Sequence, residues 1–361
     1  MTQAISASVA HDAVLEYLQN RRRGLLVQLA GIGDLVMALP AIESLRLGLP
    51  HIRWTLATRP ENIDVLQSQV DAIQAIPWPP TIWNIGAIIR GVIRLRRTRF
   101  DVAIHLYSIS SVHGALAMKV LFLAIHPCLS IGRCRFQGLR IFDVTWNDRR
   151  TSSSHEMDLN LDLICSLGLP RAGQVPVLIP RQEALRRMTA QVHERFGTAQ
   201  PFVVIFPGGR VKAQQWPVAY YSQIAEWLSA HGFGVCVIGC KDDVDGAQTI
   251  ADSAGRAGWN LAGRLTLQEV IALLPHASAY IGNDSGPTHI AAALAVPCVA
   301  LFRPSEMARY APRGLGRIRI LHSESRCPAC ERINGACHTC LESLAPETVW
   351  DTIRDMVPAL R

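Results

Sequence analysis

Short apolar runs rich in β-branched residues alternate along the chain with longer segments whose apolar residues recur at helical spacing. In the first half, strands are predicted at 25–30, 53–57, 72–76 and 101–106, and helices at about 34–47 and 83–97. In the second half, strands are predicted at 202–206, 234–238, 280–281 and 299–302, and helices at 217–230 and 288–295. Because strands that alternate with helices form parallel sheets covered on both faces, the pattern predicts an α/β protein.

The pattern stops and restarts in the middle of the chain. A polar stretch at 147–155, a helical segment at 157–167 and a proline-bounded segment at 170–180 separate the two halves. We place the boundary near residue 178, which gives domains of 1–178 and 179–361. A chain of 361 residues is long enough for two domains of ordinary size. The sequence therefore predicts two Rossmann-like domains in tandem, facing a central cleft.

Composition narrows the class of protein. Hydrophobic residues make up 49% of the chain and charged residues 18%, which excludes disordered and fibrous proteins. The net charge of +7 favours anionic partners, and nucleic acid, acidic membranes and phosphorylated small molecules all fit that sign. The most apolar run, at 120–125, is too short to span a membrane, and no secretory signal is recognised. Ten cysteines in 361 residues are too few for a disulfide scaffold, so we expect the protein to work in the reducing cytoplasm.

The first predicted strand ends in GIGD at 31–34, where a dinucleotide-binding protein would have G-x-G-x-x-G. Val36 takes the place of the third glycine, and Arg59 follows the next strand in place of the acidic residue that binds an NAD ribose. NAD is therefore disfavoured, and NADP bound through Arg59 stays open. Asp34 falls in the first turn of a helix, so its carboxylate either stabilises the helix dipole or acts as a general base.

Two further turns follow predicted strands in the second half. GNDSGPTH at 282–289 opens a helix whose backbone N–H groups suit a diphosphate, although a well-capped core helix has the same local pattern. PGGRVK at 207–212 places two cations in a glycine turn, which suits anionic oxygens, with a solvated loop as the alternative. GCKDD at 239–243 offers a carboxylate to a ribose. Asp243 and Asp245 match a D-x-D pattern but fall at a helix start, so we interpret them as capping residues.

Taken together, these motifs resemble glycosyltransferase family 9, the lipopolysaccharide heptosyltransferases. The resemblance rests on GIGD, on PGG followed by Trp216-Pro217, on NLAG at 260–263, and on GNDSGPTHIAAAL at 282–294 with VALF at 299–302. It extends from about Leu25 to the C-terminus. It implies a GT-B fold and an inverting transfer, without a catalytic metal, of a heptose or related sugar from an ADP-sugar to lipopolysaccharide core or another cell-envelope acceptor. The N-terminal domain would bind the acceptor and the C-terminal domain the nucleotide sugar.

The resemblance also assigns roles to residues. The family's catalytic aspartate falls on Asp34, as the general base, and the family's DSGPxH loop falls on 284–289, where it would contact the donor. The usual phosphate-binding lysine corresponds to Gln214, a departure that transfers this contact to Lys212 or Arg210. The expected donor-site residues are Gly208, Gly209, Arg210, Lys212, Asp242, Asp284, Ser285, Gly286, Pro287 and His289.

Two C-x-x-C pairs near the C-terminus form a candidate metal site. Cys327 and Cys330 make the first pair, and Cys337 and Cys340 the second. Four thiolates suit Zn²⁺ or Fe, and a site closed by four cysteines leaves no open position for chemistry. Any metal there would be structural, and reduced thiols or labile disulfides are the alternatives. No catalytic cofactor is expected.

The segment 83–97 interleaves isoleucines with Arg90, Arg94, Arg96 and Arg97. It suits a basic amphipathic helix on an anionic membrane, a site for an acidic glycolipid, or an ordinary helix packed on the sheet with a solvated basic face. The expected partners are an ADP-sugar donor, a glycolipid or glycan acceptor, and the inner membrane through peripheral contact, without nucleic acid. A different nucleotide-sugar donor and a non-catalytic nucleotide-sugar-binding scaffold stay open as alternatives.

Overall fold

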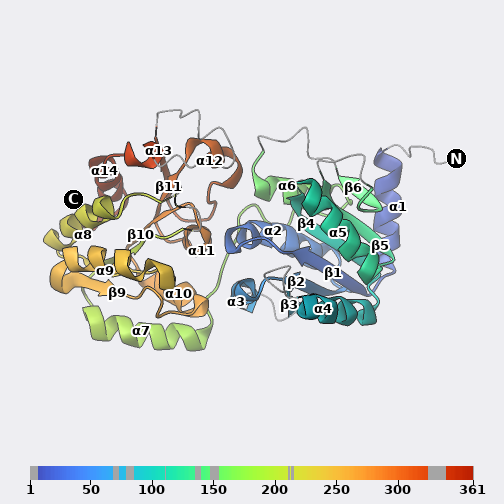
Figure 1. The fold of residues 1–361 in the computed structure, drawn as a ribbon, viewed down its shortest axis with the longest axis horizontal. Coiled ribbons are helices and arrows are strands. Elements are labelled where there is room, and N and C mark those ends of the chain that lie inside the picture. The colour runs from blue at the N-terminus through green and yellow to red at the C-terminus, as the bar shows by residue number, and fades with distance from the viewer. Residues whose placement is uncertain are drawn as a thin grey trace. The chain divides into compact units, whose positions relative to one another are not determined.

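The computed structural model describes residues 7–67, 73–78, 85–109, 111–134, 140–146, 154–209, 212, 215–323 and 339–360. The chain forms two compact units, Met1–Gln174 and Val175–Arg361, named unit 1 and unit 2 below (Figure 1). The division lies four residues before the boundary placed near residue 178 from the sequence.

Unit 1 is built on a six-stranded parallel sheet in the order β3-β2-β1-β4-β5-β6. Its strands are β1 (Arg23–Gln28), β2 (Arg53–Thr58), β3 (Gln74–Pro77), β4 (Val102–Ile109), β5 (Leu129–Cys134) and β6 (Val144–Trp146). Its helices are α1 (Ala7–Gln19), α2 (Ile32–Gly48), α3 (Ile63–Gln67), α4 (Ile85–Thr98), α5 (Val112–Ile125) and α6 (Glu156–Cys165), with a 3-10 helix η1 (Pro60–Asn62). This strand order is that of a Rossmann sheet.

Unit 2 repeats the same topology, with the order β12-β11-β10-β7-β8-β9. Its strands are β7 (Phe202–Phe206), β8 (Gly234–Val237), β9 (Gly258–Asn260), β10 (Ala279–Asn283), β11 (Cys298–Phe302) and β12 (Ile318–His322). Its helices are α7 (Gln182–Phe196), α8 (Val218–Ala230), α9 (Val244–Ser253), α10 (Leu267–Leu273), α11 (Gly286–Ala293), α12 (Pro304–Tyr310), α13 (Thr339–Glu342) and α14 (Pro346–Met356). The 3-10 helices are η4 (Lys241–Asp243), η5 (Gly255–Ala257), η6 (Leu274–His276) and η7 (Pro358–Leu360).

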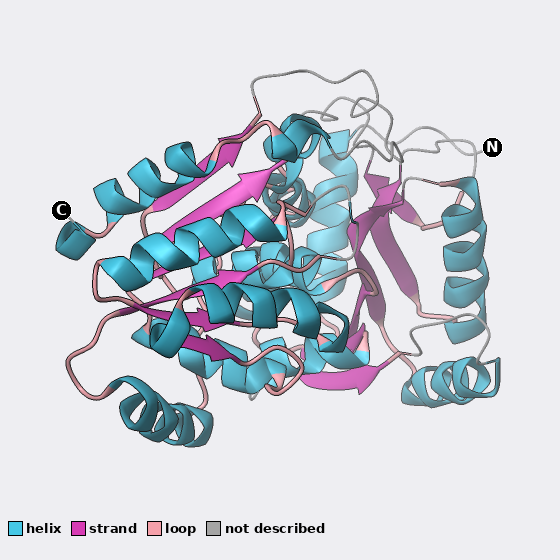
Figure 2. Cartoon of the chain, turned by 60° about the vertical axis from the view of Figure 1, so that its left-hand side comes forward, coloured by secondary structure: helices cyan, strands magenta, loops and turns pink. Residues whose placement is uncertain are grey.

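Helices cover the sheet of each unit, so that the central strands are buried on both faces (Figure 2). In unit 1, α4 and α5 pack on one face through residues such as Leu95, Ala115 and Phe122. In unit 2, one face of the sheet is covered by α8, α9 and α14. The α/β class and the two parallel sheets predicted from the alternating pattern are thereby confirmed. Among the described residues, no helix has both the length and the apolar character that crossing a bilayer would require.

The hydrophobic pattern does not predict β5, β6, β9 and β12. β6 and β9 have three residues each, and β12 at the edge of its sheet is largely half-buried. In β5 the apolar run is broken by Gly132 and Arg133. A Cβ at residue 132 would lie 2.5 Å from the ring of Phe142, and Arg133 is fully buried. Packing against the rest of unit 1, rather than local composition, makes these segments strands.

A buried polar cluster lies beneath β5. Nη1 of Arg133 is 2.9 Å from Oε1 of Glu156 and donates to Oδ1 of Asn160 over 2.6 Å. On the neighbouring strand, the buried ring of His105 stacks on Phe142 with 5.8 Å between the centroids. Burial, assisted by the charge of Arg133, lowers the pKa of His105 to about 4. His105 is therefore neutral in the folded protein at neutral pH.

This pKa predicts a loss of stability in mild acid. An unfolded histidine titrates near 6.5, so the unfolded chain binds more protons between pH 6.5 and pH 4, and stability is lost as the pH falls through that window. From pH 7.5 to pH 5.0, the free energy of unfolding of the wild type should fall by about 2 kcal/mol more than that of His105→Gln. Urea titrations at the two pH values measure this difference. Equal losses in both proteins would contradict it.

Candidate functional site

The carboxyl ends of the strands in unit 2 bring together two turns that are far apart in the sequence. β7 and β10 are neighbours, and Phe206 pairs with Gly282. The chain leaves these two strands towards opposite edges of the sheet, so a ligand crevice is expected outside their carboxyl ends. Gly208 and Gly209 follow β7, and the turn at 284–286 follows β10. The structure thus places the two glycine-containing motifs of the second half side by side.

The side chain of Asn283, at the end of β10, joins these two turns. Its Nδ2 donates to the carbonyl oxygens of Pro207 (2.7 Å) and Gly208 (3.0 Å). Its Oδ1 accepts from the backbone N–H of Trp216 (3.0 Å) and from the hydroxyl of Tyr221 (2.9 Å). Asn283 is fully buried, and all its amide donors and acceptors are used. The loop after β7 is therefore tied at both of its ends to the strand that carries the second motif.

The loop after β7 also requires glycine. Gly209 has a φ of 156°, which L side chains rarely adopt, and Nε2 of Gln215 donates to its carbonyl oxygen over 2.7 Å. A Cβ at residue 208 would lie 2.4 Å from Oδ2 of Asp243. That same oxygen accepts from the backbone N–H of Cys240 over 2.8 Å. Asp243 therefore caps η4, as the sequence predicts, and also packs against the glycine turn.

The turn after β10 opens α11 with features of an anion site. Ser285 is the N-cap, its side chain makes no capping hydrogen bond, and residues 284–287 are partly exposed. Behind the turn, the Thr288 hydroxyl donates to the carbonyl oxygen of Asn283 over 2.5 Å and lies 3.0 Å from the hydroxyl of Tyr280. Because this anchor is buried, the first turn of α11 is held in place with its positive dipole end at the crevice. His289 lies one turn in and is only 4% exposed.

The remaining donor-site residues differ in where they lie. Lys212 is exposed, and its backbone carbonyl oxygen accepts from Gln215 over 3.0 Å. Asp242 is exposed in η4, at the carboxyl end of β8. Arg210 and Gln214 lie outside the described residues, and so do three of the four candidate metal ligands, Cys327, Cys330 and Cys337. The fourth, Cys340, is buried in α13. The metal site stays a prediction.

Asp34 occupies the equivalent edge of unit 1. It lies in the first turn of α2, directly after β1, and is partly exposed. Its Oδ2 accepts from the backbone N–H of Gly31 over 3.0 Å, so it completes a capping arrangement at the start of the helix. This position in the first turn is the one that the dipole-stabilising alternative of the sequence analysis requires. A carboxylate has a second oxygen and further lone pairs, so this contact leaves the capacity to accept a proton.

Side chains at the end of β2 and in η1 hold the loop that leads to Asp34. Nδ2 of Asn62 donates to the carbonyl oxygen of Ala30 (2.9 Å) and to Oγ1 of Thr58 (2.9 Å). Nε of Arg59 donates to the carbonyl oxygen of Leu29 over 2.8 Å, and its guanidinium pairs with Glu61. Arg59 therefore supports the loop that leads to Asp34. Val36, at the third glycine position, is fully buried in α2.

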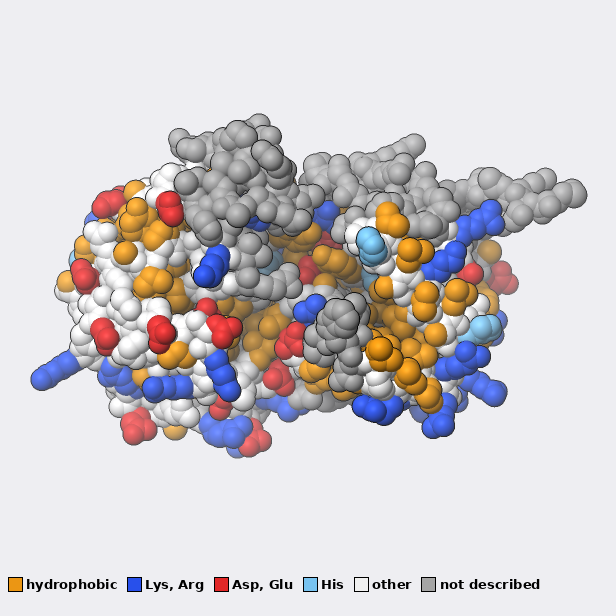
Figure 3. Space-filling model, viewed as in Figure 1, with side chains coloured by type: hydrophobic (Ala, Val, Ile, Leu, Met, Phe, Trp, Pro, Cys, Tyr) orange, Lys and Arg blue, Asp and Glu red, His pale blue; other side chains and the backbone are white. Residues whose placement is uncertain are grey.

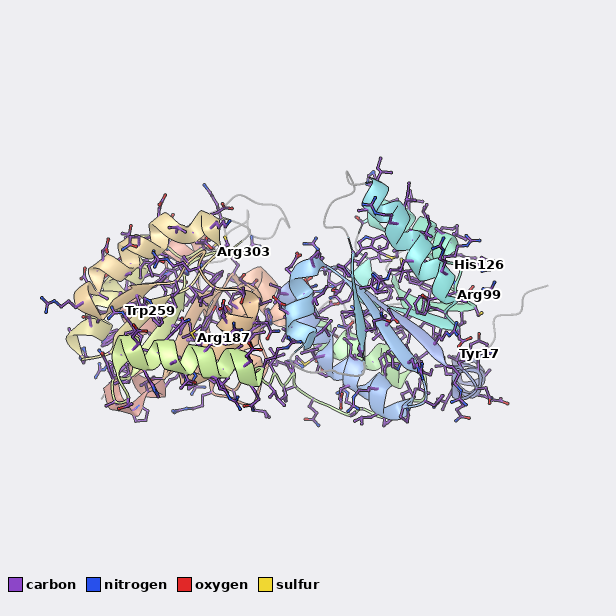
Figure 4. All side chains as sticks on the ribbon, turned by 90° about the horizontal axis from the view of Figure 1, so that it is seen from below. Tyr17, Arg99, His126, Arg187, Trp259 and Arg303 are labelled. Atoms are coloured by element: carbon purple, nitrogen blue, oxygen red, sulfur yellow. The ribbon has the colours of Figure 1, made fainter. Side chains whose placement is uncertain are left out.

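Sequence reasoning missed several residues that shape these edges. Asn283 belongs to the motif at 282–289, but the motif does not indicate that its side chain bonds the loop after β7, and nothing in the local sequence marks Tyr221 or Asn62. Arg303, which follows β11, is 4% exposed and lies at the carboxyl end of the unit 2 sheet (Figure 4). The sequence shows that an arginine directly follows this strand, which could have marked it as a candidate. That its side chain is buried, which is unusual for arginine, is visible only in the fold.

The contacts of Asn283 predict that its replacement releases the loop after β7. Asn283→Ala leaves buried carbonyl and N–H groups without partners, and the free energy of unfolding should fall by about 3 kcal/mol. Exchange of the Trp216 amide hydrogen should become much faster. Asn260→Ala is the matched control, because Asn260 bonds Ala262 and Gln248 near the same edge but not the loop. Unchanged exchange at Trp216 in Asn283→Ala would contradict the anchoring role.

The sequence is similar to those of two heptosyltransferases from Haemophilus species. The lipooligosaccharide heptosyltransferase 2 of Haemophilus influenzae is 29% identical over 208 residues, which cover 52% of this chain and 58% of that protein. That of Haemophilus ducreyi is 33% identical over 150 residues, covering 38% and 43%. The matched region thus spans about half the length of these relatives.

A solved structure shows the same fold over almost the whole chain. The ADP-heptose lps heptosyltransferase II of E. coli is 21% identical to this chain and has a TM-score of 0.75. The alignment covers 93% of this chain and 98% of that one. The two Rossmann-like sheets are therefore those of a GT-B protein. A model of glycosyltransferase family 9 (heptosyltransferase) matches residues 89–338, more than half of the sequence. On this match the chain belongs to glycosyltransferase family 9, the heptosyltransferase family.

Proposed function

We propose that this protein transfers a heptose from an ADP-heptose donor to a lipopolysaccharide-type acceptor, with inversion at the anomeric carbon. The observation that carries the proposal is the joining of the Gly208 loop to the α11 turn by Asn283 at the switch point of the unit 2 sheet. Family membership supports the sugar transfer. The names of the relatives, a lipooligosaccharide heptosyltransferase and an ADP-heptose heptosyltransferase, support the donor and the acceptor.

Unit 2 has the chemistry to hold the donor. The backbone of Gly208 and Gly209 and the N-terminus of α11 suit the diphosphate, because amide N–H groups and the helix dipole favour negative charge. Among the described residues of the glycine loop, Lys212 is a cation that could contact the phosphates. It would replace the lysine that the family usually has at the position of Gln214. Asp242, exposed after β8, suits the hydroxyls of the ribose.

Unit 1 has the chemistry to activate the acceptor. The carboxylate of Asp34 would take the proton of the acceptor hydroxyl as that oxygen forms its bond to the anomeric carbon. The bond between the anomeric carbon and the diphosphate oxygen breaks in the same displacement, and its electron pair leaves with ADP. The first turn of α11 and Lys212 would stabilise the negative charge that develops on the leaving diphosphate. This sequence of events needs no metal ion.

Asp34→Asn tests the general base. The amide oxygen of asparagine still accepts the Gly31 N–H, so the cap is kept while the ability to take a proton is lost. The kcat for heptose transfer should fall about 10²–10⁴-fold, with the affinity for ADP-heptose unchanged. Glu61→Gln, which alters an exposed acid on η1, is the matched control and should keep full activity. Turnover that survives in Asp34→Asn would remove the base assignment.

Lys212→Ala tests the phosphate contact. Loss of a charge-assisted contact to the diphosphate should weaken ADP-heptose binding at least tenfold, measured by calorimetry. Arg187→Ala is the control, because Arg187 (labelled in Figure 4) is an exposed cation on α7, a helix that packs against α10. Equal affinities for Lys212→Ala and the wild type would assign the phosphate to another group.

The departure at Gln214 favours a second candidate, the same fold and mechanism with a different nucleotide-sugar donor. Thermal stabilisation by ADP-heptose, ADP-glucose, UDP-sugars and GDP-sugars separates the two candidates. Stabilisation by ADP-heptose supports the proposal, and a preference for UDP- or GDP-sugars would replace the donor. Binding of ADP-heptose without turnover by the wild type would instead indicate a nucleotide-sugar-binding scaffold.

A further inference from the structure

Large apolar side chains are exposed mainly on two helices of unit 1. Of the 13 such side chains among the described residues, seven belong to α4 and α5, which together contain 28 residues. The most exposed of the seven are Val120 (66%), Leu123 (65%) and Ile85 (64%). The set, called the α4–α5 surface below, is Ile85, Ile89, Ile93, Val112, Leu116, Val120 and Leu123.

Helical periodicity makes these side chains two continuous stripes. Ile85, Ile89 and Ile93 recur every four residues along α4, and the residues of α5 recur at spacings of four, four and three. The opposite faces of both helices are buried against the sheet. α4 and α5 pack on each other, so the stripes lie side by side and point away from the sheet. Figure 3 shows hydrophobic atoms gathered over this part of unit 1, bordered by Lys and Arg.

The segment of the chain that contains this surface carries an excess of positive charge. Residues 72–142 contain nine of the 36 Lys and Arg but one of the 29 Asp and Glu, so the rest of the chain is close to neutral. The one acid, Asp101, accepts the backbone N–H groups of Arg22 and Arg23, each over 2.9 Å. Its carboxylate therefore binds the backbone at the start of β1. An apolar surface with this charge is complementary to an anionic partner that also has an apolar interior.

A pocket of about 660 Å³ lies where the carboxyl ends of α4 and α5 meet. Its lining combines apolar side chains with three arginines and a histidine, namely Ile93, Arg96, Arg97, Arg99, Phe100, Ile125, His126 and Cys128. Arg99 and His126 follow the two helices with φ values of 52° and 57°, and they lie next to one another at one end of unit 1 (Figure 4). Nη1 of Arg96 donates to the carbonyl oxygen of Ala124 over 3.1 Å, which ties the two helices at this end.

The α4–α5 surface also extends towards the edge that carries Asp34. α5 begins after the carboxyl end of β4, as α2 begins after that of β1, and the two strands are neighbours in a parallel sheet. The apolar stripe therefore runs from the edge of unit 1 that holds Asp34, near Val112, to the arginine-lined pocket at the opposite edge. A membrane in contact with the stripe would come close to the edge at which the acceptor hydroxyl is activated.

We propose that the α4–α5 surface docks on an anionic lipid bilayer. The isoleucine and leucine stripes enter the interface between headgroups and acyl chains, and the arginines of the pocket contact lipid phosphates. The use of this docking for catalysis rests on the proposed function, in which the acceptor is a membrane lipid. A second copy of the chain fits the surface less well, because a two-fold interface would place these arginines against themselves.

Binding to vesicles tests the docking. Without any substrate, the full-length protein should sediment with vesicles containing phosphatidylglycerol at least tenfold more strongly than with vesicles of phosphatidylcholine alone. Arg96→Ala/Arg97→Ala should lower the partition coefficient about 25-fold, or about fivefold per arginine, which corresponds to ~1 kcal/mol each. Leu116→Gln/Leu123→Gln should lower it about tenfold or more, because the stripe loses apolar area.

Matched variants in unit 2 make the experiment specific. Arg186→Ala/Arg187→Ala removes two exposed arginines of α7, and Leu315→Gln removes an apolar side chain that is 72% exposed, so both should bind vesicles as the wild type does. Equal loss in the test and control variants would overturn the proposal, and so would failure of the wild type to bind anionic vesicles. A wild type that is dimeric by light scattering, with monomeric Leu116→Gln/Leu123→Gln and no vesicle binding, would assign the surface to self-association.

Separate measurements distinguish a failure of the docking proposal from a failure of the proposed function. All the variants of α4 and α5 should bind ADP-heptose with wild-type affinity in vesicle-free buffer, because none lies at the unit 2 edge. Donor binding without vesicle binding would overturn the docking alone. Vesicle binding by a protein that does not bind ADP-heptose would overturn the proposed function and keep the docking.

Discussion

One buried amide, that of Asn283, decides the position of the site on which the proposed chemistry depends. Its two donors and its acceptor oxygen are satisfied by the loop after β7, the backbone before α8 and a tyrosine within α8. Each buried polar group left without a partner costs about 1–3 kcal/mol, so release of this loop from the sheet of unit 2 carries a clear energetic penalty. The glycines at the crevice therefore have a fixed backbone, although glycine by itself allows many backbone conformations.

Unit 1 uses the same solution with different residues. Asn62 and Arg59 hold the backbone before Asp34 by donating to the carbonyl oxygens of Ala30 and Leu29. Both sheets thus present flexible residue types at their carboxyl edges, and both fix them through side chains from neighbouring elements. A group that must meet a substrate needs accurate placement, and anchoring from a packed core supplies it without covering the group itself.

The two faces of unit 1 differ in what they expose. β1, β2 and β4 are covered on both sides, yet α4 and α5 carry outward-facing apolar stripes, and the segment that contains these helices has most of the chain's excess positive charge. Scattered apolar residues on a surface need no explanation, but seven on two adjacent helices form a contiguous feature. Its direction follows from the Rossmann topology, since α5 has to start at the edge where β4 ends.

The sequence by itself determined the α/β class, the restart of the pattern in the second half and the motifs at the strand ends, because strand and helix periods and turn residues are local properties. It also identified Asp34 and the turn at 284–289 as candidates. Only the tertiary structure decided that β5 is a strand despite Gly132 and Arg133, and that Asn283 bonds a loop some 75 residues away. It alone showed which isoleucines of α4 face solvent. Pairing, burial and exposure depend on contacts between distant segments, which a single sequence does not contain.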